Sequence, residues 1–150
     1  MSLTISIGKN WYYSRRFNFL WLQLVKVTKR FKYLLFVILS NMITKQQILV
    51  FKTSADKVYL SKDYTSATIL YFKALFAVQD FLLVEKSGES PKDHNVRFRM
   101  LEKNFPELFK ELDIEFSTYR DTYSKILDKN TCDRIKKIVE NDIKKYKIAE

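Results

Sequence analysis

Histidine and cysteine, which often carry catalysis or bind metals, each occur once in this chain of 150 residues, as His94 and Cys132. His94 follows Ser90 and Pro91 and precedes an apolar-periodic segment, so we place it in the first turn of a helix. There its imidazole can act as a general base, donate a hydrogen bond to phosphate, or hydrogen-bond a neighbouring helix end. Cys132 lies on the apolar stripe of the last predicted helix, which indicates a small buried side chain rather than a nucleophile.

Three glutamates repeat at one-turn spacing, as Glu107, Glu111 and Glu115. This ladder resembles a metal site, but no Glu-x-x-His motif accompanies it, so a solvated helix face is the preferred interpretation. One histidine and one cysteine exclude a multi-histidine cluster and a cysteine-rich zinc site within a single chain. The two glycines exclude a phosphate-binding loop and a dinucleotide-binding fingerprint. We therefore predict no metal and no cofactor.

Arg120 is the strongest candidate for ligand binding, because it stands among phenols. Tyr119 precedes it directly, and Tyr123 follows three residues later on a neighbouring helix face. A guanidinium beside two phenols can bind phosphate, stack on a base, or hold a carboxylate across a bundle. The competing interpretation is a salt bridge to Asp121 or to another helix. The candidate ligand-binding residues are thus Arg120, Tyr123, His94 and Tyr119.

Apolar residues recur at helical spacing from residue 44 onward, and no segment shows the period of a strand. The pattern predicts helices near residues 44–60, 64–86, 90–105, 106–123 and 130–148. Asp63, Ser90 and either Asn130 or Thr131 are the expected caps, and Gly88 is the expected helix stop. The 64–86 segment is apolar over most of its circumference, which is typical of a central helix. We predict an all-α, antiparallel, up-and-down bundle of about five helices.

The basic charge is concentrated at the front of the chain. The formal net charge is +10, yet residues 1–55 hold nine Lys and Arg residues and no acid. The remaining 18 basic residues face 17 acids, which is the balance of an ordinary soluble domain. We therefore divide the chain into a basic, aromatic N-terminal extension, residues 1–41, and a helical domain, residues 42–150.

The extension leaves three interpretations open. Its two apolar patches, 17–25 and 33–39, are each shorter than the roughly 20 residues that span a bilayer. The extension can lie on a membrane surface as a basic helix anchored by Trp11, Trp21 and Phe31. It can instead pack against the main domain or against a second copy. In the third interpretation, translation naturally begins at Met42.

Residues 44–148 resemble the HEPN domain family in the order of several short segments. An acidic-Tyr-x-x-Ala helix start stands at residues 63–67, and a Lys-Ala-Leu segment stands at 73–75. A Pro-x-x-His turn occupies 91–94, an arginine-containing helix covers 119–123, and the last helix corresponds to 132–148. Residues 1–41 lie outside the resemblance.

The resemblance implies a homodimeric, cytoplasmic module that binds nucleotide or RNA and often works beside a nucleotidyltransferase. Catalytic HEPN ribonucleases carry an arginine followed, after four to six residues, by histidine. Counting from Arg120, the expected positions hold Lys125, Ile126 and Leu127, so the motif is incomplete. The resemblance therefore favours the non-catalytic branch of the family.

Two alternatives belong to other functional classes. One is a metal-independent, toxin-like ribonuclease whose remodelled site uses Arg120, Tyr123 and His94. The other is a structural or membrane-associated assembly protein that acts through residues 1–41.

Overall fold

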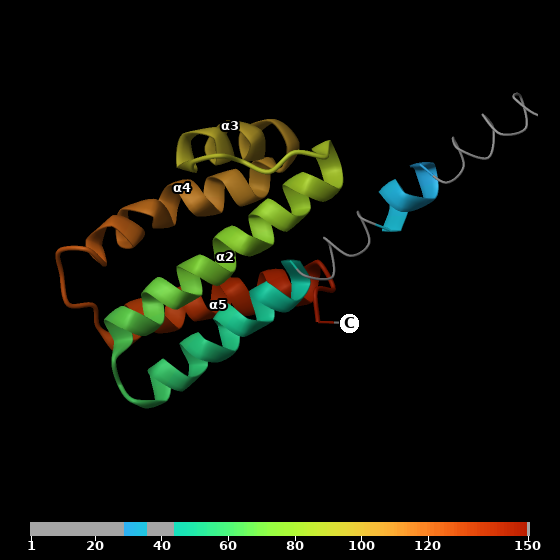
Figure 1. Ribbon diagram of the computed structural model, residues 1–150. Helices are drawn as coiled ribbons and strands as arrows, with labels where there is room; N and C mark the ends of the chain where they lie inside the picture. The colour runs from blue at the N-terminus through green and yellow to red at the C-terminus, as the bar shows by residue number, and fades with distance from the viewer. Residues whose placement is uncertain (1–28, 36–43, 150) are drawn as a thin grey trace, which may run out of the picture. The chain divides into compact units, whose positions relative to one another are not determined.

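The computed structural model describes residues 29–35 and 44–149, in two separate units. The first unit, Met1–Ser40, is described by residues 29–35, which are helical. The second unit, Asn41–Glu150, is a bundle of five helices within the described residues: a helix at 44–60, α2 (Tyr64–Ser87), α3 (His94–Asn104), α4 (Pro106–Asp121) and α5 (Lys129–Lys145) (Figure 1). The predicted anchors Trp11 and Trp21, the patch at 17–25, most of the patch at 33–39, and Met42 lie outside the described residues.

Aspartate side chains begin three of these helices. Asp63 accepts the backbone N–H of Ser66 at 3.0 Å and caps α2, as predicted. The predicted caps of the other two helices were wrong, because Asp93 caps α3 and Asp128 caps α5, each through an N–H three residues further on. α3 therefore begins at His94, three residues after Pro91, and His94 occupies the first turn of α3, as predicted.

Gly88 ends α2, as predicted. Its backbone is left-handed, with a φ of 75°, and its N–H bonds the carbonyl of Val84 at 2.8 Å. Glycine has no Cβ, so it adopts this conformation without steric cost.

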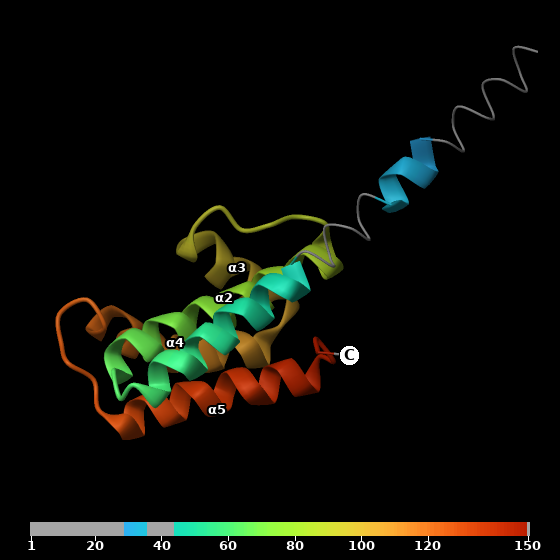
Figure 2. The same cartoon turned by 60° about the horizontal axis from the view of Figure 1, so that its bottom comes forward.

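α2 is the central helix of the bundle, and the other four helices of the bundle surround it (Figures 1 and 2). It is also the one helix among the described residues that is long and apolar enough to cross a membrane, although 67% of that stretch is buried inside the protein. Burial of this kind is typical of the core helix of a globular bundle. The core residues that α2 contributes are Ala67, Tyr71, Phe72, Ala74, Leu75, Phe76, Val78, Phe81, Leu82 and Leu83.

The link between α2 and α3 departs from the predicted up-and-down order. His94 contacts Phe76, and Arg97 pairs with Asp80, so residue numbers rise together along both helices. α3 therefore runs in the same direction as α2, and residues 88–93 carry the chain back along the bundle (Figure 1). The described bundle is all-α, but its direction does not alternate at every helix.

Candidate functional site

An aromatic cluster fills the space between α2, α3 and α4. Tyr119 lies at its centre, with ring centroids 5.3 Å from Phe72, 5.0 Å from Phe76 and 5.4 Å from His94. Most of these ring pairs are tilted or edge-on, which is the arrangement that aromatic quadrupoles prefer. The full aromatic cluster comprises Phe72, Phe76, His94, Phe98, Phe109, Phe116, Tyr119 and Tyr123.

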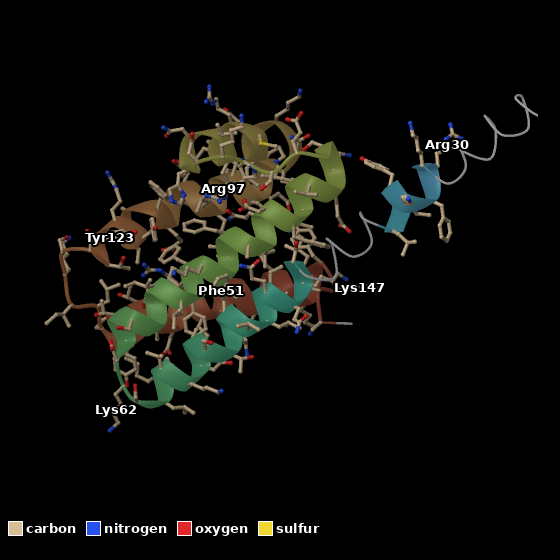
Figure 3. All side chains as sticks on the ribbon, in the orientation of Figure 1. Arg30, Phe51, Lys62, Arg97, Tyr123 and Lys147 are labelled. Carbon is tan, nitrogen blue, oxygen red and sulfur yellow. The ribbon has the colours of Figure 1, made fainter. Side chains whose placement is uncertain are left out.

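A buried arginine joins α2 to α3 at the edge of this cluster. Arg97 binds Asp80 with both ends of its guanidinium, through Nε at 2.7 Å and Nη2 at 2.8 Å. Its third bond runs from Nη1 to Nδ1 of His94, at 2.8 Å. The same guanidinium lies 4.9 Å from the ring centre of Phe76, and Figure 3 shows Arg97 between the helices. We call this set the Asp80–Arg97–His94 chain.

The Asp80–Arg97–His94 chain fixes the tautomer of His94. An arginine has no acceptor, so Nδ1 must accept the bond from Arg97, and the imidazole proton stands on Nε2. Burial lowers the pKa of His94, and the positive charge of Arg97 lowers it further, against a smaller opposing effect of Asp80 and Asp93. The imidazole is therefore neutral near pH 7 and offers an N–H donor.

A tyrosine pair extends the cluster toward solvent at the end of α4. The hydroxyls of Tyr119 and Tyr123 are 2.7 Å apart, and their rings pack edge to face at 5.5 Å. Burial, followed by the bond to Tyr123, raises the pKa of Tyr119 to about 12, so its hydroxyl stays protonated at neutral pH. Tyr123 is 75% exposed and presents a ring to solvent (Figure 3).

Arg120 is exposed, and its side chain makes no hydrogen bond or ion pair within the part of the chain that the structure describes. Asp121, the partner considered from the sequence, pairs instead with Lys125 at 2.9 Å. Arg120 stands one turn beyond Phe116, which contacts His94 from the same side of α4. It therefore lies on the α3 side of α4 and leaves its guanidinium free for a ligand.

The structure thus brings His94, Tyr119 and Tyr123 into one cluster and places Arg120 beside it without direct contact. Sequence reasoning missed Arg97, which makes more polar contacts with the cluster than Arg120 does. The available signal was its spacing of three residues from His94, which puts both side chains on one helix face. The pairing with Asp80 depends on α2 and α3 lying side by side.

The glutamate ladder is divided among three environments. Glu107 is exposed and pairs with Lys145 at 2.9 Å, as a solvated face requires. The prediction was wrong for Glu115, which is 6% exposed and binds Arg134 through both carboxylate oxygens. Glu111 is partly buried, and burial raises its pKa. Among the described residues, no group of three or more His, Cys, Asp or Glu side chains is placed to hold a metal ion.

Cys132 is fully buried, as predicted. Burial raises the pKa of its thiol, which disfavours the reactive thiolate. Its position on the inward face of α5 makes it a packing residue.

Comparisons with known protein families, with curated proteins and with solved structures found no match to this chain.

Proposed function

We propose that residues 42–150 form a HEPN-like helical module that binds single-stranded RNA or a nucleotide without cutting it. The observation that carries this proposal is the exposed ring of Tyr123 three residues after Arg120, whose exposed guanidinium has no partner among the described residues. Single-stranded nucleic acids are bound by aromatic rings that stack on bases and by cations that contact phosphates. Arg120 stands in the last turn of α4 and Tyr123 stands three residues later, in the turn that follows the helix, so neighbouring parts of one nucleotide can engage both.

The aromatic cluster holds the ring of Tyr123 in place. Tyr123 is fixed by the hydroxyl and ring of Tyr119, and Tyr119 packs against Phe72 and Phe76 of the central helix. A stacking ring that is already ordered loses little conformational entropy on binding. His94 adds an Nε2–H donor from the start of α3, which suits a phosphate or a base carbonyl.

The same contacts argue against RNA cleavage at this site. Attack by a ribose 2′-hydroxyl needs a base with a free lone pair near neutral pH. Nδ1 of His94 is bonded to Arg97, Nε2 carries the proton, and Tyr119 holds its own proton up to about pH 12. The guanidinium of Arg97 is in turn committed to Asp80, so it is not available to stabilise a developing phosphorane.

Fluorescence anisotropy with a labelled oligouridine tests this proposal directly. Since base stacking on an aromatic side chain is worth roughly 1–3 kcal/mol, Tyr123→Ala should weaken binding about 5- to 160-fold. Arg120→Ala should weaken it and reduce the salt dependence by about one phosphate contact. Arg99→Ala is the matched control, because Arg99 is an exposed arginine on α3 whose own contact is a 3.4 Å bond to the carbonyl of Asn95. Equal affinities for all three variants and the wild type would refute the site.

Incubation with total RNA in EDTA tests the alternative, a metal-independent ribonuclease. Cleavage that disappears in Arg120→Ala would replace the binding proposal with the catalytic one. Intact RNA, together with measurable oligouridine binding, supports binding alone.

The resemblance also motivates a homodimer and a nucleotidyltransferase partner. Leu60 is 79% exposed and Ile126 is 97% exposed. They lie at the same end of the bundle, where the backbone N–H of Leu127 bonds Thr65 at 2.9 Å. Light scattering coupled to size exclusion measures the oligomeric state, and Ile126→Lys should favour the monomer if this end forms the contact.

A further inference from the structure

The described part of the N-terminal unit is a helix whose two faces differ in chemistry. Residues 29–35 are helical, so Phe31, Leu34 and Leu35 share one stripe, because they stand three and four residues apart. Lys29 stands on the opposite face, and Arg30 and Lys32 flank the stripe on its two sides. We call Phe31, Leu34 and Leu35 the apolar stripe.

The apolar stripe is open to solvent. Phe31 is 62% exposed, Leu34 is 56% exposed and Leu35 is 43% exposed. Tyr33, between them in sequence, is 70% exposed. Contiguous apolar side chains in water mark a surface that meets a protein, a ligand or lipid.

The charges around the stripe indicate which of these it meets. Residues 1–55 hold nine basic residues and no acid, and three of the nine, Lys29, Arg30 and Lys32, belong to the described helix. Such a segment attracts any polyanion, and both RNA and an anionic leaflet qualify. RNA offers nothing for Leu34 and Leu35 to enter, whereas the boundary between headgroups and acyl chains accepts aliphatic side chains at a depth of about 5–10 Å. The charge and the apolar stripe together therefore favour a bilayer.

We propose that residues 29–35 bind the surface of a membrane that contains anionic lipid. The apolar stripe enters the headgroup–acyl boundary, and the three cations stay at the level of the lipid phosphates. Tyr33 stands on the polar side, where a phenol can hydrogen-bond to headgroups. The bundle of residues 44–149 has its own buried core, so this attachment does not require the bundle to open.

Vesicle flotation with the full chain tests this proposal. The vesicles are phosphatidylcholine alone, or phosphatidylcholine mixed with phosphatidylserine. Each basic residue near an anionic leaflet contributes roughly fivefold to membrane partitioning, so a triple Lys29→Gln, Arg30→Gln, Lys32→Gln variant should partition about 100-fold less. A triple Phe31→Ser, Leu34→Ser, Leu35→Ser variant should lose at least about tenfold.

Ile114→Ser is the matched control, because Ile114 is an aliphatic residue of the bundle that is 72% exposed. Flotation on the mixed vesicles, its loss in both triple variants and its retention in Ile114→Ser support the proposal. No flotation at low salt, equal flotation on both vesicle types, or full flotation of the Ser variant overturns it. Oligouridine affinity is measured in parallel. If the Gln variant loses RNA binding while its flotation is unchanged, the three cations bind RNA, and the membrane proposal is also overturned. Thermal melts of all variants verify that the bundle remains folded.

Discussion

A buried carboxyl pair between α4 and α5 should make the stability of this protein fall as pH rises. Asp142 is 4% exposed, and its Oδ2 has no hydrogen-bond partner among the described residues. The same is true of Oε1 of Glu111. Burial raises the pKa of Asp142 to about 7, and the neighbouring Glu111 adds to the increase, against a weaker lowering by Lys145.

The direction in which stability changes with pH follows from the number of protons that each state binds. Between the ordinary pKa of 3.8 and about 7, the folded protein keeps a proton on Asp142 that the unfolded chain releases. The stabilising contribution is therefore complete below about pH 4 and is lost as pH rises through 7. Since each pKa unit corresponds to about 1.4 kcal/mol, the free energy of unfolding falls by about 4 kcal/mol at most over this pH range.

Asp142→Asn tests this reasoning, because the amide has nearly the size of the carboxyl group and is neutral at every pH. Chemical denaturation at about pH 5 and about pH 8 gives the free energy of unfolding of each form. We expect the variant to be more stable than the wild type at the higher pH, by about 2–4 kcal/mol, and to lie closer to it at the lower pH. Asp121→Asn, at a partly exposed site where the carboxylate pairs with Lys125, is the control. A difference between wild type and Asp142→Asn that is the same at both pH values would refute the buried proton.

Two further predictions concern buried polar groups. Arg97→Ala should lower the free energy of unfolding by about 2–4 kcal/mol, because it leaves Asp80 without its partner and removes the bond to His94. Arg97→Lys should recover only part of the lost stability, because an ammonium group cannot bind Asp80 through two nitrogens as the guanidinium does. Full recovery would show that only the positive charge matters. Gln79→Leu should raise stability by about 1–3 kcal/mol, because Gln79 is fully buried and neither amide atom finds a partner among the described residues. Thermal unfolding measures both, and a destabilised Gln79→Leu would mean that the amide is satisfied in solution.

The helical content was available in the sequence because it depends on local patterns. The apolar period of residues 64–86 predicted a central helix, and α2 is that helix. Gly88 and Asp63 were predicted correctly as its two ends, since each acts within a few residues of the chain. The starts of α3 and α5 were less certain, because several polar residues near each start are equally good caps by type. Asp93 and Asp128 are the residues that have the extended backbone of an N-cap and whose carboxylates accept the N–H three residues further on.

The candidate site was predictable in part. His94, Tyr119 and Tyr123 were chosen for their chemistry, and the structure places them in one aromatic cluster. Arg97 escaped notice because its partner Asp80 lies 17 residues earlier, on another helix. The burial of the glutamates could not be predicted from the sequence either, because Glu107 and Glu115 lie on the same helix at a regular one-turn spacing. The partners Lys145 and Arg134 come from α5 and leave one exposed and the other buried.

The sequence by itself determined that the bundle of residues 44–149 is helical, where its long central helix begins and ends, and that the positive charge lies at the front of the chain. Periodicity, caps and composition are local properties, so the amino-acid sequence contains them completely. The tertiary structure alone decided that α3 runs parallel to α2, that Arg97 is committed to Asp80 and His94, and that the side chain of Arg120 has no polar partner among the described residues. Those outcomes depend on which helix faces meet, and side chains far apart in sequence compete for the same contacts only once the bundle has formed.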